Sequence, residues 1–160
     1  MAPELNSAKR YPVVGVGGVV VRDGRVLLAR RGTPPLEGRW SIPGGRVEWG
    51  ETIERALIRE LREEAGLDVR VIELIEIVER IFDEKPNAPG ADEPRSASDP
   101  QYHFVILDFY CEAPRGEACA GGDARGIAWA AEHELARYDL TEAATRVIHR
   151  AFAMARDRHT

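Results

Sequence analysis

The chain has 160 residues, of which 44% are hydrophobic and 31% charged, a composition typical of one globular domain around a single hydrophobic core. No apolar run approaches the roughly 18 residues needed to cross a bilayer, and the polar start lacks the apolar stretch of a secretory signal, so we expect a cytoplasmic protein. The net charge of −5 disfavours tight binding of long nucleic acids, but a small anionic ligand could be held through a bound cation.

The first part of the chain predicts a β-hairpin followed by a loop and a short strand. The predicted elements are strands over 13–21 and 26–29, a tight turn between them at 22–25, a loop over 31–39 and a strand over 40–42. β-Branched residues favour the long strands, and Asp23-Gly24 is typical of hairpin turns. Gly and Pro predict the loop, and Pro43-Gly44-Gly45 predicts a break after the short strand.

The second part predicts three strands and a closing helix. The predicted strands cover 69–81, 102–113 and 127–130, and the closing helix follows the capping residue Thr141. Apolar residues at helical spacing from Ala144 to Phe152 predict that this helix packs on the sheet. The stretch 83–101, rich in Pro, Ala, Ser and charge, predicts a flexible insertion, with a lid as the alternative. We expect 1–10 to be an N-terminal extension and 11–157 to be one domain.

Between these two parts lies a predicted helix with an ordered pattern of charges. Thr52 can cap its start, and Gly66 supplies the left-handed residue that ends many helices. At about 100° per residue, the helix has a core-facing arc, a solvated arginine face and a glutamate border. The core arc comprises Leu57, Ile58, Leu61 and Ala65, the arginine face Arg55, Arg59 and Arg62, and the border Glu60, Glu63 and Glu64.

The glutamate border predicts a cation site. Carboxylates at i, i+3 and i+4 repel, which costs a few tenths of a kcal/mol for each pair. Arg59 can pair with Glu63, but Glu60 and Glu64 lie well around the helix from the arginine face. Mg²⁺, which favours carboxylate oxygens, water and phosphate, compensates better. A solvated acidic patch is the alternative for the helix alone, yet the glycines of 43–45 would let the backbone approach a metal or phosphate closely.

The spacing of these residues resembles the Nudix box. In that pattern, Gly is followed after five residues by Glu and, after seven more, by Arg-Glu, an aliphatic residue, any residue, Glu-Glu, any residue, Gly and an aliphatic residue. The matching positions are Gly45, Glu51, Arg59, Glu60, Leu61, Glu63, Glu64, Gly66 and Leu67. The resemblance implies an α/β fold, namely the Nudix-type α/β/α sandwich with a mixed sheet between helices.

The resemblance also implies roles for these residues in a Mg²⁺-dependent hydrolase, with Mn²⁺ as an alternative metal. The implied metal ligands are the Gly44 carbonyl, Glu60, Glu63 and Glu64. Glu51 and Arg59 have supporting catalytic roles. Arg59 would orient the carboxylates through salt bridges, and Glu51 would brace the junction of loop and helix or contact a metal. Glu63 and Glu64 are candidates for the general base.

Four more residues are candidates for the site. Arg30 and Arg31 end a strand and could direct a guanidinium at phosphate, although one of the two should alternate outward. Trp40 could stack on a base, with a core position as the alternative. Asp123 is a further candidate base or metal ligand, and the alternative is an ordinary turn aspartate.

The function implied by the resemblance is hydrolysis of a phosphoanhydride bond in a nucleoside diphosphate linked to another moiety, first among them a nucleoside-diphosphate sugar such as ADP-ribose. One alternative is a nucleoside-triphosphate pyrophosphohydrolase that removes damaged nucleotides. Another is a non-catalytic nucleotide-sugar sensor, which the complete set of box carboxylates disfavours. The partner we expect is therefore a small-molecule nucleotide, neither a nucleic acid nor a membrane, and a homodimer is left open.

Overall fold

The computed structural model describes residues 10–82 and 100–160, which form two helices, one 3₁₀ helix and seven strands. In chain order these are β1 (Val13–Arg22), β2 (Arg25–Arg31), β3 (Trp40–Ser41), β4 (Gly44–Arg46), α1 (Ile53–Ala65), β5 (Arg70–Phe82), β6 (Tyr102–Glu112), β7 (Ala124–Ala131), η1 (Glu132–Tyr138) and α2 (Glu142–Arg158). Nearly all of the predicted insertion over 83–101 and extension over 1–10 lies outside the described residues. No described helix is both long and apolar enough to cross a membrane.

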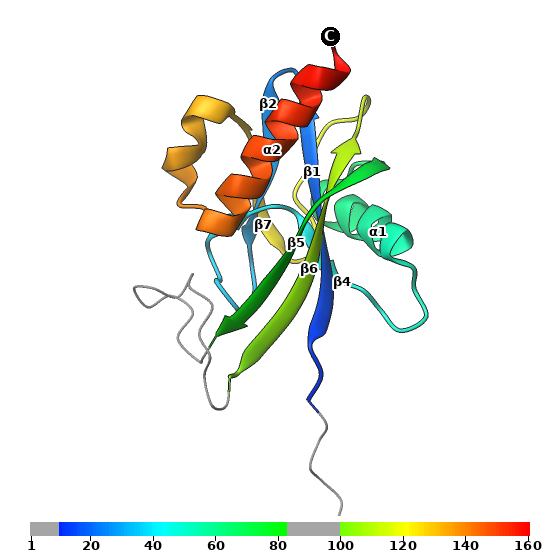
Figure 1. Cartoon of the computed structure of the whole chain (residues 1–160), viewed down its shortest axis with the longest axis vertical. Coiled ribbons are helices and arrows are strands. Elements are labelled where there is room, and N and C mark those ends of the chain that lie inside the picture. The colour runs from blue at the N-terminus through cyan, green and yellow to red at the C-terminus, as the bar shows by residue number, and fades with distance from the viewer. Residues whose placement is uncertain (1–9, 83–99) are drawn as a thin grey trace, which may run out of the picture.

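The strands form one mixed sheet in the order β3-β2-β1-β6-β5, with β4 also paired to β1 and β7 to β2. β1 runs parallel to β6 over Val13 to Val20 and antiparallel to β2 and β4. The two helices cover opposite faces of the sheet (Figure 1). This arrangement confirms the predicted α/β/α sandwich with a mixed sheet between helices.

Each helix closes its own hydrophobic core on the sheet. On one side, Leu57 and Leu61 of α1 pack with Val16 and Val20 of β1. On the other side, the apolar stripe of α2 packs with Val19 of β1 and with residues of β2 and β6. Because side chains alternate along β1, this one strand contributes to both cores. It is therefore the centre of the domain.

The local predictions made from turn and capping residues are confirmed. Asp23 and Gly24 have φ angles of 52° and 71°, as expected of a primed turn that joins two antiparallel strands. Thr52 accepts a hydrogen bond from the Arg55 amide at 3.2 Å, and Gly66, with φ of 66°, ends α1 in the left-handed conformation. Each of these features depends on a few adjacent residues only.

The chain does break after the short strand, at Ile42-Pro43, but the predicted extent of the break is wrong for Gly44 and Gly45, which belong to strand β4 beside β1. A Cβ atom at Gly44 would lie 1.9 Å from the Val16 carbonyl oxygen, so only glycine allows so close an approach. Glycine is common in turns, but here it allows two strands to pack closely. The 3₁₀ helix η1 was also not predicted, although Glu134 accepts a hydrogen bond from the Ala131 amide at its start at 2.8 Å.

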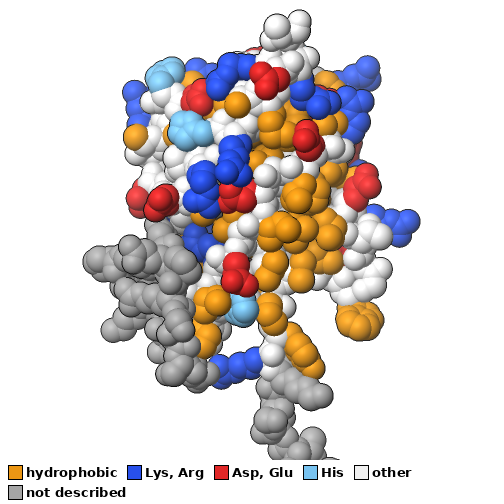
Figure 2. Space-filling model, in the orientation of Figure 1, with side chains coloured by type: hydrophobic (Ala, Val, Ile, Leu, Met, Phe, Trp, Pro, Cys, Tyr) orange, Lys and Arg blue, Asp and Glu red, His pale blue; other side chains and the backbone are white. Residues whose placement is uncertain are grey.

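Part of the surface remains apolar. Figure 2 shows hydrophobic side chains gathered in the middle of one face of the molecule. On β5, Leu74 and Ile77 are 42% and 57% exposed. Contiguous apolar surface is typical of interaction sites. These features do not test whether the chain forms a homodimer, a possibility that the sequence leaves open.

We expect Gly44→Ala to destabilise the protein by about 3 kcal/mol, because the added methyl group meets backbone that cannot move aside. Gly126→Ala is the matched control, since a Cβ there would make only ordinary contacts, at 3.6 Å from the Trp40 ring and 3.8 Å from Arg30. Chemical denaturation of both variants checks this prediction. Equal stability of the two variants would contradict the close packing of β4 on β1.

Candidate active site

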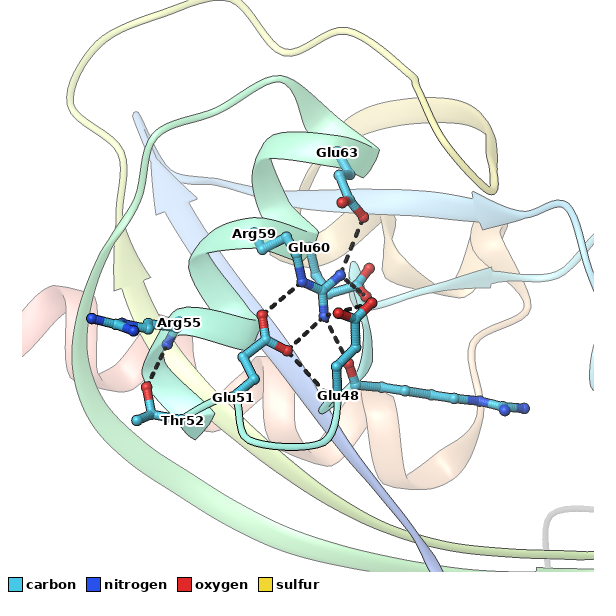
Figure 3. A network of polar contacts seen from close by, with 8 residues as sticks. Glu48, Glu51, Thr52, Arg55, Arg59, Glu60 and Glu63 are labelled. Carbon is cyan, nitrogen blue, oxygen red and sulfur yellow. Dashed lines mark hydrogen bonds and ion pairs between the residues drawn. The ribbon is translucent and has the colours of Figure 1, made fainter.

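Arg59 lies at the centre of a network of carboxylates (Figure 3). Its Nε and Nη2 donate to the two oxygens of Glu51 at 2.7 and 2.9 Å, in the bidentate geometry that guanidinium groups favour. Its Nη1 donates to Glu60 Oε1 at 2.7 Å and to Glu63 Oε2 at 3.3 Å. These partners, Glu51 first, raise the pKa of Arg59 above its usual range. The guanidinium thus joins the loop before α1 to two glutamates of the helix.

The prediction that Arg59 belongs to a solvated face, apart from Glu60, is wrong. Its side chain is only 24% exposed, and Glu60 is one of its nearest partners. A helical wheel places Cα positions, whereas long helical side chains point back toward the N-terminus of the helix. Arg59 can therefore reach Glu51, which precedes α1, and Glu60 beside it. The proposed role of Arg59 in orienting the carboxylates fits this network.

Glu51 is held in the loop that leads into α1. Its carboxylate accepts from Arg59 and also from the Glu48 amide, at 3.0 Å. These hydrogen bonds, that of Arg59 first, lower the pKa of Glu51 to about 2. With both oxygens engaged, Glu51 fits the bracing role better than direct contact with a metal.

Glu64 is the most deeply placed of the three box glutamates. Its Oε2 accepts a hydrogen bond from the Gly44 amide at 3.0 Å. Burial, reinforced by the charges of Glu60 and Asp123, raises the pKa of Glu64 to about 7, although the Gly44 amide and Arg31 oppose the rise. A nearby cation would stabilise the ionised form of a carboxyl group held in this way.

The register of β4 also determines where the Gly44 carbonyl points. Gly18 donates to the Pro43 carbonyl and Val47 donates to the Val14 carbonyl, both at 2.9 Å. Because hydrogen-bonded and non-hydrogen-bonded pairs alternate in an antiparallel ladder, the N–H and C=O of Gly44 turn away from β1, to the side where Glu64 lies. The carbonyl predicted as a metal ligand therefore lies on the same side of β4 as Glu64.

The position of the Glu60 carboxyl group depends on a second glycine, Gly45. A Cβ atom at Gly45 would lie 2.3 Å from Glu60 Cδ, so the carboxyl group packs directly on the strand backbone. Burial raises the pKa of Glu60, and the hydrogen bond from Arg59 opposes this rise. By contrast, the Glu63 side chain is 53% exposed. The three glutamates thus differ in burial although they share one border of the helix.

The structure separates the two candidate arginines. Arg31 lines the cavity beside Glu64 and donates from Nε to the Pro35 carbonyl at 2.7 Å. Burial lowers its pKa, whereas the charges of Glu64 and Asp123 oppose this effect. Arg30 is exposed and donates to the Gly38 carbonyl at 3.0 Å. The alternation expected from a strand therefore leaves Arg31 as the candidate phosphate ligand.

Asp123 follows a segment that packs on the end of α1, where the Gly121 amide donates to the Glu64 carbonyl at 3.1 Å. The Asp123 backbone carbonyl accepts from the Gly32 amide at 2.8 Å, which fixes the turn before β7 beside the loop after β2. Its side chain is exposed at the cavity and close enough for its charge to act on Glu60 and Glu64. Trp40, in contrast, packs edge to face on Tyr138 at 5.4 Å between ring centroids, in one of the cores. That position favours the core interpretation over base stacking.

One end of a cavity of about 470 Å³ is lined by Arg31, Gly44, Glu60, Glu64 and Asp123. The other end is formed by apolar side chains of β5 and β6 and by the start of α2, with Val78, Phe82, Phe104 and Ile106 among them. In the described part of the chain, no three His, Cys, Asp or Glu side chains already converge on one point as a formed metal site. Mg²⁺ commonly binds through one or two carboxylates, water and substrate phosphate. The Gly44 carbonyl with Glu60 and Glu64 fits that donor set.

Known proteins resemble this chain in both sequence and structure. The family model of the NUDIX domain matches residues 11–151. An ADP-ribose pyrophosphatase of Methanocaldococcus jannaschii is 34% identical over 115 residues, which cover 72% of this chain and 59% of that relative. A nucleoside triphosphatase of Salmonella paratyphi B is 34% identical over 133 residues, 78% of this chain and 86% of that relative. The chain therefore spans about three fifths of the archaeal relative and most of the bacterial one.

Among solved structures, a MutT NUDIX hydrolase from Burkholderia pseudomallei is similar to this chain with a TM-score of 0.69 and 30% sequence identity. The match covers 88% of this chain and 98% of that chain. The similarity thus extends over most of the fold of both chains.

We expect Glu51→Gln to destabilise the protein at neutral pH and to have no effect in strong acid. Because Arg59 holds the pKa of Glu51 at about 2, its stabilisation is complete above the usual carboxyl pKa near 4.3 and is lost as the pH falls through about 2. The difference in urea midpoint between the two proteins should be constant above about pH 5 and shrink below it. Glu54→Gln, exposed in the first turn of α1, is the control. A pH-independent difference would contradict the ion pair.

Proposed function

The chain belongs to the NUDIX family, and from that premise we propose that it hydrolyses a phosphoanhydride bond in a nucleoside diphosphate linked to another moiety. The first substrate class is a nucleoside-diphosphate sugar such as ADP-ribose, which would yield a nucleoside monophosphate and a sugar phosphate. The observation that carries this proposal is the pair Glu60 and Glu64, both partly buried beside Arg31 at one end of a nucleotide-sized cavity. The charge of Glu60 acts on Glu64, so a cation bound beside both would stabilise their ionised forms.

Members of this family typically use a divalent metal, and Glu60, Glu64 and the Gly44 carbonyl at the cavity would hold it, with the more exposed Glu63 and Asp123 as further ligands. Bound Mg²⁺ or Mn²⁺ supplies charge neutralisation for the diphosphate and lowers the pKa of water. Arg31 would bind a phosphate oxygen, for which its planar guanidinium suits the geometry. Arg59 would hold Glu60 and Glu63 in place, and Glu51 would hold Arg59.

The reaction requires that water lose a proton as its oxygen attacks phosphorus and the bridging P–O bond breaks. Glu63 and Glu64 are the candidate bases. Glu64 lines the cavity, where a substrate and its attacking water would lie. Glu63 is more exposed and contacts Arg59. We therefore favour Glu64 as the group that takes the proton from water.

The second candidate function is a nucleoside-triphosphate pyrophosphohydrolase. It is favoured by the Salmonella relative, which is named as a nucleoside triphosphatase. The same carboxylates, Arg31 and cavity would serve both reactions, since both cleave a phosphoanhydride bond next to a nucleoside. A sensor without turnover receives less support, because all three box glutamates are present.

A substrate panel tests the proposal. The purified chain with Mg²⁺ is incubated with ADP-ribose, other nucleoside-diphosphate sugars, dinucleoside polyphosphates and nucleoside triphosphates, and the released products are quantified. We expect turnover of ADP-ribose-like substrates to exceed that of triphosphates. The reverse order would support the second function. Specific binding of a nucleotide sugar without any turnover would support the sensor and overturn both.

We expect the double variant Glu63→Gln and Glu64→Gln to lose activity by orders of magnitude while keeping its fold. The side-chain carbonyl introduced by Glu64→Gln can still accept from the Gly44 amide, and the Glu63 ion pair is exposed and so contributes little to stability. Without metal, the melting temperature should hold or rise, since a carboxyl whose pKa is raised by burial is removed. The control double variant, Glu54→Gln with Glu73→Gln, removes two exposed charges. Near-normal turnover of the site variant would end the metal-site proposal.

A further inference from the structure

Asp108 is a buried carboxyl group that the proposed chemistry does not use. It lies on β6, is 6% exposed and lines the cavity at the end away from the glutamates. Its neighbours in sequence, Val105 to Leu107 and Phe109 to Tyr110, are all apolar. The other buried polar residue of the described chain, Thr141, is explained by its bond to the Ala144 amide as the cap of α2. Asp108 has no comparable structural explanation.

The carboxyl group of Asp108 lies over a glycine and lacks a hydrogen-bond donor. In the parallel pairing of β1 with β6, Gly17 is its partner, and a Cβ atom at Gly17 would lie 2.1 Å from Asp108 Oδ1. Among residues 10–82 and 100–160, no group is found to donate to this carboxyl. Burial and the charge of Glu76 raise the pKa of Asp108 to about 7. Glu76 itself is bound by Arg146 and Arg150 of α2.

Such a carboxyl group is poorly solvated in the free protein. No buried side-chain nitrogen or oxygen of the described residues lacks a partner, so the Asp108 oxygens remain reachable from the cavity, but burial leaves them fewer bonds to water than an exposed carboxyl has. Apolar residues of similar size would avoid this penalty, and Gly17 would not need to leave room. The arrangement becomes favourable when a ligand in the cavity supplies the missing partner.

The position of Asp108 relative to the glutamates indicates which part of a ligand it meets. Strands β4, β1 and β6 are adjacent, and Gly17 pairs with Gly44 on one side and with Asp108 on the other. Two strand spacings separate the backbone of Asp108 from that of Gly44, but the Asp108 carboxyl lies over Gly17, on the strand between them. The Gly44 amide turns away from β1 to bind Glu64, so a diphosphate held on that side would leave its nucleoside to extend across β4 and β1 toward Asp108. The apolar walls at this end suit the faces of a planar ring.

We propose that Asp108 hydrogen-bonds to the Watson–Crick edge of the nucleobase, so that the cavity holds the base at β6 and the diphosphate at α1. This inference rests on the proposed nucleotide function and adds the residue that recognises the base. The Watson–Crick edge of each common base carries an N–H group next to an acceptor atom. A protonated carboxyl offers one O–H donor and one carbonyl acceptor, which complement such an edge.

Binding of ADP and of inorganic pyrophosphate, each with Mg²⁺, tests the proposal by calorimetry on the full chain. Pyrophosphate shares the phosphates of ADP and lacks the base. We expect Asp108→Leu to weaken ADP binding by about 10- to 100-fold and to leave pyrophosphate binding within about twofold, because only the bond to the base is lost. Asp108→Asn keeps a donor and an acceptor and should bind ADP within a few-fold of wild type. Both variants should melt at or above the wild-type temperature.

Three results would overturn the assignment: equal weakening of ADP and pyrophosphate by Asp108→Leu, unchanged ADP binding in that variant, or equal loss of ADP binding in the Asn and Leu variants. The wild-type substrate panel keeps the two proposals apart. Turnover of nucleotides together with any of these results removes the role of Asp108 alone. Absence of turnover removes the proposed hydrolase, whatever the variants do.

Discussion

The site depends on the close packing of the glycine strand β4 between β1 and α1. Gly44 has no room for a side chain above Val16, and its free amide holds Glu64 at 3.0 Å. Gly45 has no room for a side chain against Glu60. Two carboxyl groups of the helix are thus positioned directly by strand backbone, with no intervening side chain that could change rotamer. Gly45, the glycine of the Nudix box, therefore matters more for this contact than for loop flexibility.

The same packing makes the site unfavourable until a ligand binds. Burial raises the pKa of Glu60, Glu64 and Asp108, so each ionised group is destabilised in the folded protein. Arg59 offsets only part of this destabilisation, because Glu60 is the one of these three carboxyl groups with which it forms an ion pair. Stability given up at a site in this way is typical of positions kept for binding or catalysis. One end of the cavity therefore favours a bound cation, and the other end holds the Asp108 carboxyl, to which no described residue donates a hydrogen bond.

The sequence predicted the features that depend on neighbouring residues. The turn at Asp23-Gly24, the cap at Thr52 and the box spacing are local, and the structure confirms the turn and the cap. It could not predict strand β4 or the position of Asp108, because both depend on how β1 pairs with strands far along the chain. A signal for Asp108 was present, since a single acid inside the apolar run 105–110 is unusual for a buried strand.

The two ends of the cavity differ in how closely they would hold a substrate. At the glutamate end, Glu63 and Asp123 are exposed, so a group attached beyond the diphosphate would extend toward solvent. At the base end, Phe82 and Asp108 are buried and leave little freedom. In the proposed orientation, the fixed contacts would fall on the nucleoside diphosphate half, which ADP-ribose and a nucleoside triphosphate share. This cavity would then accept either substrate, and the choice between them would come from contacts to the second half.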